Sequence, residues 1–346
     1  MRVLNFAVIG INHDHIHGQI GALRRAGATC AGFYAAEDDL AAAFMARYPE
    51  IPRVTEAARL YEDRAIDLVV SAAVPADRAA IAITAMRHGK DVMLDKPGVT
   101  SLAQLHEVKA VQAETRRIVS IMYSEHFEVA ATVRAGELVA AGAIGEVVNL
   151  IGMGPHRLRK PERPGWFFER ERYGGILTDI ASHQCEQFMF FAAADDAEIL
   201  SASVGNRANA DRPGLQDIGD MHLRTPHGVT GYIRVDWFTP DGLPTWGDGR
   251  LTIIGTQGTI ELRKYLDIAG RPGKDHLFLV DRSGMRHIDC SAVELPYGRQ
   301  LVADIFDRTE TAMPQARCFK AMEIALKAQH LAETGRLPSG YSQEAA

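Results

Sequence analysis

The feature that most constrains this chain is the regular alternation of short apolar, β-rich runs with helical stretches over its first third. Alternation at this interval predicts parallel strands joined by right-handed crossovers, which is the doubly wound arrangement of an α/β domain. The predicted strands are 6–11, 29–34, 67–73, 91–95 and 117–122. The predicted helices are 13–26, with Asn12 as its cap, then 39–48, 76–88 and 101–114.

After a further helix at 128–141 the pattern changes to successive strands separated by glycine and proline turns. Such spacing predicts a large, mostly antiparallel sheet, with one intervening helix at 174–191 and a long final helix at 316–333. The predicted strands are 147–153, 199–205, 221–223, 229–236, 250–254, 259–263, 276–280 and 285–289. Because 346 residues exceed one ordinary core, we predict a Rossmann domain over 1–124 and an α+β domain over 125–346.

The bulk composition excludes several classes of protein. The 38 Lys and Arg against 44 Asp and Glu give a net charge of -6, so no basic face for nucleic acid is expected. The four cysteines are widely spaced without a CxxC pair, which predicts reduced thiols and a cytoplasmic protein. No apolar run is long enough for a signal peptide or a membrane span, so no membrane association is expected.

The turn between the first strand and the first helix is the expected dinucleotide site. A Rossmann turn normally carries three glycines, for a tight bend, for approach of the pyrophosphate and for helix packing. Here Gly10 is in place, but Asn12 and His15 occupy the second and third positions, so this motif alone is weak evidence. The amides of a helix N-terminus still favour phosphate. The predicted cofactor-binding residues are Gly10, Ile11, Asn12, His13, His15, Ala73, Asp95 and Lys96.

Three interpretations of the segment His13-Asp14-His15-Ile16-His17 stay open. Imidazoles and a carboxylate are ordinary metal ligands, but only His13 and His17 would share a helix face. Contact with phosphate or substrate is a second interpretation, and a helix start with solvated histidines is the third. We predict no metal site.

The choice between NAD and NADP is also open. The acidic residue that binds the ribose hydroxyls would fall near Ala35, and Glu37 and Asp38 are close to it. No arginine stands in this segment to hold a 2′-phosphate, so both cofactors remain candidates.

Two further motifs suggest acid–base chemistry. Asp95-Lys96-Pro97 follows a strand at the carboxyl edge of the parallel sheet, where open α/β folds bind ligands, and a lysine there can donate to a substrate oxygen. In Gly174-Gly175-Ile-Leu-Thr-Asp179-Ile-Ala-Ser-His183, the carboxylate and the imidazole are four residues apart on one helical face. That pairing suits a general acid–base, although such pairs are often only surface contacts.

Together these motifs resemble the glucose–fructose oxidoreductase / inositol dehydrogenase / MocA family. Asp95-Lys96-Pro97 is similar to its Glu-Lys-Pro motif, and Gly174 to His183 to its glycine-rich Asp-x-x-x-His helix. Ala76 and Arg78 depart from the Asn and His usual in that family. Supporting matches are 46–49, 87–90, 142–147 and 325–335.

The resemblance implies hydride transfer between NAD(P) and a hydroxyl of a sugar, polyol or related small alcohol. It implies that Lys96 binds the reacting oxygen, that His183 is the general acid–base, and that Asp179 orients substrate or His183. It also implies a homo-oligomer, a dimer or tetramer, formed through the open sheet of the second domain.

Other polar groups are candidates for the substrate pocket, and two alternative functions stay open. The predicted substrate-binding residues are His126, His156, Arg157 and Trp166, with Arg170 nearby. Trp237 and Trp246 are interpreted as packing residues or as oligomer contacts. The alternatives are a redox-neutral lyase, glycosidase or epimerase that retains its NAD, and a non-catalytic ligand sensor.

Overall fold

The computed structural model describes residues 2–338, which form two compact units. The first contains the chain up to Tyr123 together with Glu171–Gly174 and Pro296–Phe319. The second contains Ser124–Arg170, Gly175–Leu295 and the chain from Lys320 onward. Two later segments of the chain therefore pack with the first unit. The division at 124 into two contiguous domains stays a prediction.

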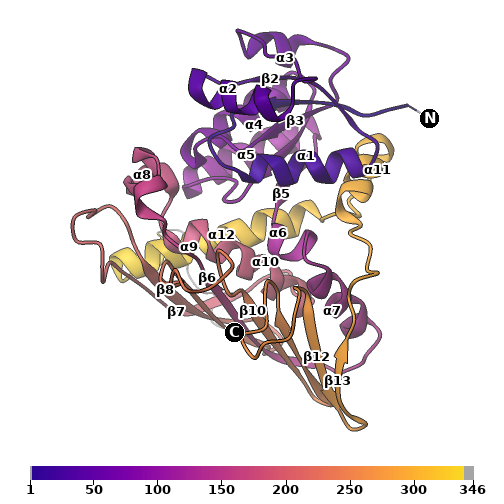
Figure 1. Ribbon diagram of the computed structural model, residues 1–346, viewed down its shortest axis with the longest axis vertical. Helices are drawn as coiled ribbons and strands as arrows, with labels where there is room; N and C mark the ends of the chain where they lie inside the picture. Colours follow the sequence, from indigo (N-terminus) through magenta and orange to yellow (C-terminus); the bar gives the residue numbers. More distant parts are fainter. Residues whose placement is uncertain (1, 339–346) are drawn as a thin grey trace. The chain divides into compact units, whose positions relative to one another are not determined.

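The first unit is built on a five-stranded parallel sheet, which confirms the doubly wound α/β prediction (Figure 1). Its strand order is β2-β1-β3-β4-β5. Every residue of β3, β4 and β5 is buried, as expected for parallel strands that helices cover on both faces. The strands are β1 (Asn5–Ile9), β2 (Thr29–Tyr34), β3 (Leu68–Ser71), β4 (Asp91–Asp95) and β5 (Val119–Met122).

The helices of this region largely follow the predictions, with one correction at the first cap. Ser101 caps α5, where its hydroxyl accepts the amide of Gln104 at 3.2 Å. Asn12 is not the cap of α1, because that helix begins at His15 and Asp14 occupies the capping position. The elements are α1 (His15–Arg25), α2 (Asp38–Arg47), α3 (Ala58–Glu62), η1 (Pro75–Asp77), α4 (Arg78–Arg87), α5 (Leu102–Thr115), α8 (Arg170–Tyr173) and α11 (Tyr297–Asp307).

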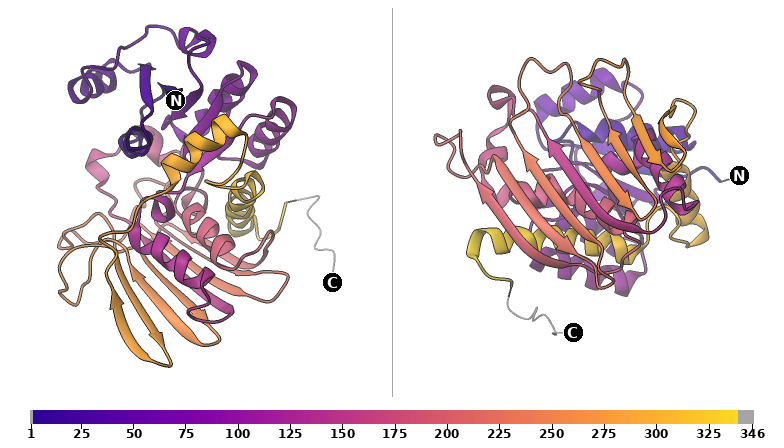
Figure 2. Two further views of the ribbon diagram at one scale, coloured as in Figure 1. Left: turned by 90° about the vertical axis from the view of Figure 1, so that its right-hand side faces the viewer. Right: turned by 90° about the horizontal axis from the view of Figure 1, so that it is seen from below.

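The second unit is built on an eight-stranded sheet of order β13-β12-β11-β10-β6-β9-β8-β7 (Figure 2). All neighbouring strands are antiparallel except β6 and β9, which confirms the prediction of a mostly antiparallel sheet. The strands are β6 (Val147–Pro155), β7 (Glu198–Gly205), β8 (Ile218–Arg224), β9 (Thr230–Asp236), β10 (Arg250–Gly255), β11 (Gly258–Arg263), β12 (His276–Asp281) and β13 (Gly284–Ile288).

Helices of this unit pack on one face of that sheet, and glycines let one of them, α10 (Ala181–Phe191), approach closely. A Cβ on Gly154 of β6 would lie 2.9 Å from Nε2 of Gln184, and one on Gly231 of β9 would lie 2.6 Å from Cδ2 of Phe188. None of the unit's described helices lies on the opposite face (Figure 2). The helical elements are α6 (Ser124–Phe127), α7 (Ala130–Ala140), η2 (Lys160–Glu162), η3 (Gly165–Phe168), α9 (Ile176–Asp179), α10 (Ala181–Phe191) and α12 (Gln315–Thr334), which begins in the first unit.

The single helix predicted over 174–191 is wrong, because it breaks at Ile180 into α9 and α10. The carbonyl of Asp179 accepts the hydroxyl of Ser182 at 3.2 Å, and the amide of His183 donates to the carbonyl of Ile180. The hydroxyl of Ser182 thus takes the place of the backbone amide that would donate to the carbonyl of Asp179 in a continuous helix. Asp179 ends one helix and His183 lies in the first turn of the next.

No helix within residues 2–338 combines the length and the apolar character needed to cross a membrane.

Candidate active site

The candidate cofactor edge lies where the strand order reverses, between β1 and β3, a position at which open α/β sheets bind ligands. Gly10 follows β1 with a φ of +82°, and its amide donates to the carbonyl of Tyr34 at 3.0 Å. A Cβ there would lie 2.4 Å from the Cβ of Ala73, which follows β3. The fold therefore brings Gly10 and Ala73 together, and a side chain at position 10 would be excluded.

The two residues that replace the usual glycines both have side chains tied to carboxylates. The amide of Asn12 donates to Oε1 of Glu37 at 2.8 Å. Nδ1 of His15 lies 2.8 Å from Oδ1 of Asp95. These bonds fix both side chains, so the loop is held by polar contacts in place of glycine packing. Ile11, between Gly10 and Asn12, is buried.

This part of the chain fits a dinucleotide by its backbone. Gly10 supplies the left-handed turn, the strand order supplies the crevice, and α1 begins directly after the turn with its amides at that edge. The residues present that would hold a pyrophosphate are Gly10 to His15, and a bound nicotinamide would supply the hydride-accepting ring.

Histidines 13 and 15 converge with Asp95, which the sequence did not predict. One ligand atom from each lies within 4.8 Å of the other two, a spacing that a metal ion could bridge. However, Nδ1 of His13 accepts the amide of His15 at 3.2 Å, and Asp95 already accepts from a buried arginine. His17 is directed elsewhere, with Nδ1 3.2 Å from the hydroxyl of Tyr48. These competing partners disfavour a cation, and the absence of a metal stays a prediction.

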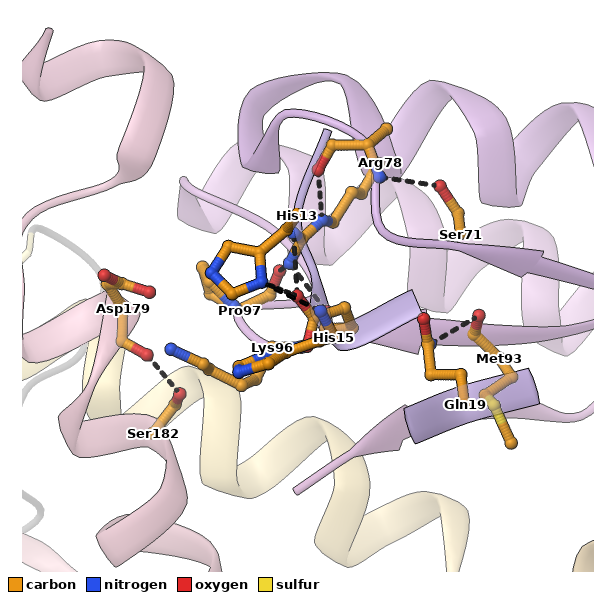
Figure 3. A network of polar contacts seen from close by, with 12 residues as sticks. His13, His15, Gln19, Ser71, Arg78, Met93, Lys96, Pro97, Asp179 and Ser182 are labelled. Carbon is orange, nitrogen blue, oxygen red and sulfur yellow. Dashed lines mark hydrogen bonds and ion pairs between the residues drawn. The ribbon is translucent and has the colours of Figure 1, made fainter. Parts of the chain in front are cut away.

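Arg78 is the residue that sequence reasoning missed. Its guanidinium is 0% exposed, and Figure 3 shows it beside His13 and Pro97. Nε donates to the carbonyl of Ala73 at 2.8 Å, and Nη1 donates to the carbonyls of Asp95 and Pro97 at 2.9 and 2.8 Å. Nη2 donates to Oδ2 of Asp95 at 3.0 Å. One side chain thus joins the ends of β3 and β4. The available signal was an arginine where the resemblance expects histidine.

Buried charge sets the ionisation of this edge. Burial alone would raise the pKa of Asp95, but the positive charges of His15 and Arg78 and the hydrogen bond from His15 hold it well below its ordinary value. Burial, with a smaller effect of His15, lowers the pKa of His13 well below 6.5. Asp95 is therefore an anion and His13 a neutral imidazole at neutral pH.

Lys96 is fixed directly beside this carboxylate. Its backbone amide donates to Oδ1 of Asp95 at 2.8 Å, and the residue is only 4% exposed. Asp95 therefore has two roles. It accepts the ion pair from Arg78, and it orients the backbone of Lys96.

In the second unit, Gly175 positions the Asp179 and His183 segment. Its φ is +86°, and a Cβ there would lie 2.3 Å from Cδ of Gln329. Oε1 of Gln329 accepts the amide of Leu177 at 2.9 Å, so α12 anchors the first turn of α9. Asp179 and His183 are 8% and 2% exposed, and Figure 3 shows the carbonyl of Asp179 bonded to Ser182.

A buried polar network under α10 was also missed by sequence reasoning. Nζ of Lys264, 1% exposed, donates to Oε2 of Glu125 at 2.6 Å and to Oε1 of Gln187 at 2.8 Å. Nε2 of Gln187 in turn donates to the carbonyl of His183 at 3.0 Å. Two residues 139 positions apart thereby support the helix that carries His183, a pairing that no local sequence pattern signals.

The residues predicted to line a substrate pocket make several structural contacts. Nδ1 of His126 lies 2.8 Å from Oε2 of Glu186, and its ring packs 4.3 Å from that of Phe190. Nη2 of Arg157 donates to the carbonyls of Pro240 and Leu243, which holds the loop after β9. The contacts of His126 and Arg157 stabilise the second unit. A role of these two residues in substrate binding stays a prediction.

The remaining predicted pocket residues belong to an aromatic group or to an ion pair. The ring of His156 lies 4.5 Å from Trp246 and 5.4 Å from Trp237. Trp166 lies in η3, half-buried against Phe167. Arg170 is ion-paired with Glu333 of α12. Substrate contact by these residues also stays a prediction.

Fold and site define an oxidoreductase with a Rossmann domain and a second α+β unit, and comparison with known proteins agrees. Residues 4–123 match the model described as the oxidoreductase family with an NAD-binding Rossmann fold, and residues 132–261 match the GFO/IDH/MocA C-terminal domain. The chain belongs to the GFO/IDH/MocA family of NAD-binding oxidoreductases.

Similar proteins include one of high structural likeness. A solved structure of a proposed oxidoreductase from Erwinia carotovora atroseptica is 41% identical, covers 95% of this chain and 98% of that one, and has a TM-score of 0.93. The 1,5-anhydro-D-fructose reductase of Ensifer adhaerens is 25% identical over 70% of each chain. The uncharacterized oxidoreductase YdgJ of Escherichia coli is 29% identical over 41% of this chain, a match that spans only 40% of YdgJ.

Proposed function

We propose that this protein catalyses reversible hydride transfer between a nicotinamide dinucleotide and a hydroxyl of a sugar, polyol or related small alcohol. The observation that carries the proposal is the buried Lys96 held beside Asp95 and Arg78 at the carboxyl edge of the parallel sheet. Burial of a lysine costs free energy, and a buried lysine at a ligand-binding edge therefore supports a functional role. The sugar-reductase relative supports the substrate class.

In this proposal three side chains divide the work. The ammonium group of Lys96 donates a hydrogen bond to the reacting oxygen. The imidazole of His183 takes the proton of the substrate hydroxyl. The hydrogen on the carbon that bears this hydroxyl leaves as hydride to the nicotinamide, which converts the alcohol to a carbonyl. Asp179 orients the substrate or His183. General acid–base groups of this kind contribute about 10²- to 10⁴-fold to the rate.

The end of β2 supports NAD as the preferred cofactor. Glu37 is fixed there by Asn12, and a carboxylate beside the ribose accepts its hydroxyls but repels a 2′-phosphate. The fold also brings Arg53 to this point, since its Nη2 donates to the carbonyl of Ala35 at 3.1 Å. No arginine stands in the segment after β2 itself, and the Arg53 that folding brings there is paired with Asp38 at 2.7 Å.

We also propose a homo-oligomer formed through the helix-free face of the eight-stranded sheet and a cytoplasmic location. The register places Ile151, Tyr232 and Thr252 side by side, all half-buried, which supplies apolar surface on one row of the sheet. The four cysteines are all free thiols. Light scattering of the purified protein tests the assembly, and a monomer at micromolar concentration would contradict it.

The test of the activity begins with dinucleotide binding by thermal shift and a sugar and polyol panel followed by NAD(P)H absorbance. We expect Lys96→Met and His183→Asn to lower kcat at least 100-fold, and the Kd for dinucleotide to stay within about fivefold in His183→Asn. Lys109→Met, at an exposed position on α5, is the matched control and keeps full activity.

Each alternative outcome has a distinct meaning. Wild-type turnover by Lys96→Met would overturn the assignment of this lysine. Tightly retained cofactor with product formation but no accumulating NADH would replace net oxidation with redox-neutral chemistry. If neither dinucleotide shifts the melting temperature at millimolar concentration, the ligand-sensor alternative holds.

A further inference from the structure

A second polar cavity lies in the first unit, at the edge of the parallel sheet opposite to Gly10 and Lys96. Asp67 immediately precedes β3, Asp91 begins β4, and Arg117 stands two residues before β5, so the cavity lies at the amino ends of these strands. Its volume is about 400 Å³. The parallel arrangement separates it from the carboxyl edge by the length of the strands.

The lining of this cavity is strongly cationic. Five basic side chains, Arg2, Arg64, Lys90, Arg117 and Arg308, face two carboxylates, so the formal balance of this lining is five minus two, or +3 with His88 neutral. Ordinary protein surfaces mix both signs, and a concave site of one sign concentrates ions of the opposite sign.

The two carboxylates are already paired within the cavity. Nη1 and Nη2 of Arg308 donate to the two oxygens of Asp91 at 2.7 and 2.8 Å. Arg2 is ion-paired with Asp67. These two pairs cancel in charge and leave Arg64, Lys90 and Arg117 as the source of the excess.

None of these three cations has a carboxylate partner among the described residues. Nζ of Lys90 donates to the carbonyls of Asp63 and Ile66 at 2.5 and 2.9 Å. Nε of Arg117 is buried yet makes no hydrogen bond in the part of the chain that the structure describes. Arg64 is exposed. A buried guanidinium nitrogen without an acceptor costs free energy, and it identifies Arg117 as a cation that the described residues do not neutralise.

Mutual repulsion adds to this cost. Burial lowers the pKa of Lys90, the carboxylates of Asp63 and Asp67 oppose this shift, and the Arg117 guanidinium lowers the pKa by the smallest of these effects. An anion between the two cations would remove that repulsion.

We propose that this cavity is a binding site for a small multivalent anion that carries phosphate or carboxylate groups, independent of the dinucleotide site. Arginine matches both groups with paired donors, and the three unpaired cations suit a ligand of two or three negative charges. The cavity has room for more than one such group.

The test is calorimetric titration of the full chain with inorganic pyrophosphate and, separately, with citrate, at constant ionic strength set by chloride. We expect wild type to bind at least one of them and Arg64→Gln/Arg117→Gln to raise that Kd at least tenfold. Arg59→Gln, an exposed position on α3 outside the cavity, is the matched control and leaves the Kd unchanged. Circular dichroism establishes that each variant is folded.

A second titration in the presence of saturating NADH separates this site from the cofactor edge, where phosphate groups also bind. We expect the Kd to be the same with and without NADH. Competition by NADH, binding that survives in the double variant, or no binding of either anion by wild type would each overturn the proposal. None of these outcomes depends on turnover, so failure here leaves the proposed function untouched.

Discussion

The guanidinium of Arg78 and the carboxylate of Asp95 form a fully buried ion pair, with Nη2 3.0 Å from Oδ2 and side chains 0% and 1% exposed. The same arginine holds the carbonyls of Ala73 and Pro97, and the same carboxylate holds the amide of Lys96. The ion pair thus connects the turn after β3 with the segment that carries the candidate catalytic lysine.

Removal of this arginine is expected to destabilise the first unit. Arg78→Met leaves Asp95 as a buried charge without its guanidinium partner, which costs about 3–5 kcal/mol of unfolding free energy in urea titrations. Arg172→Gln breaks an exposed pair with Asp77 and serves as the control, with a loss below about 1 kcal/mol. The double variant Arg78→Met/Asp95→Asn should lose less unfolding free energy than the sum of the two single variants. A loss equal to that sum would show that the two residues are not coupled.

A side chain at Gly10 is expected to impair both stability and cofactor binding. Gly10→Ala would place a methyl group 2.4 Å from the Cβ of Ala73 at a φ of +82°, at a cost of about 1–3 kcal/mol. The dinucleotide Kd should rise at least tenfold, measured by fluorescence titration. Gly18→Ala, in α1 with no neighbour within 4 Å, is expected to stabilise by up to about 1 kcal/mol. An unchanged Kd in Gly10→Ala would remove this turn from the cofactor site.

Cofactor preference is expected to depend on the charges that follow β2. Glu37→Gln/Asp38→Asn removes two carboxylates and releases Arg53 from its ion pair. We expect the ratio of the NADP Kd to the NAD Kd to fall about tenfold, which corresponds to ~1.4 kcal/mol. Asp39→Asn, at the adjacent exposed position, is the control. A ratio that does not move in the double variant would place the ribose elsewhere.

Stability is expected to fall on mild acidification because of His13. Its pKa is lowered in the folded protein, so between 6.5 and that lower value the unfolded chain binds the additional proton. The free energy of unfolding therefore decreases as pH falls through this window and recovers above 6.5. His13→Gln should make this slope shallower by up to about 1.4 kcal/mol per pH unit.

The measurement is urea denaturation at intervals between pH 7.5 and 5.5. His330→Gln, at an exposed position on α12, provides the comparison and should keep the wild-type slope. Equal slopes in wild type and His13→Gln would show that folding does not lower the pKa of this ring.

The sequence by itself determined the two sheets and the position of Lys96 after one of their strands. Apolar runs of four to six residues between helical stretches define β1 to β5 within a few residues, because periodicity and burial are local properties of the chain. The same locality placed Asp95 and Lys96 at the end of β4. It also led to the error at 174–191, since the hydroxyl of Ser182 that interrupts the helix leaves no periodic signal.

Only the tertiary structure decided which charged groups meet. His15 and Asp95 are 80 residues apart, Arg78 and Asp95 are 17 apart, and Glu125 and Lys264 are 139 apart. No periodicity connects such positions, because each pairing arises when folding removes water from a charged group and brings groups of opposite charge within reach. The chain's pattern thus sets the scaffold, whereas the exclusion of water inside it selects the contacts that hold the candidate site.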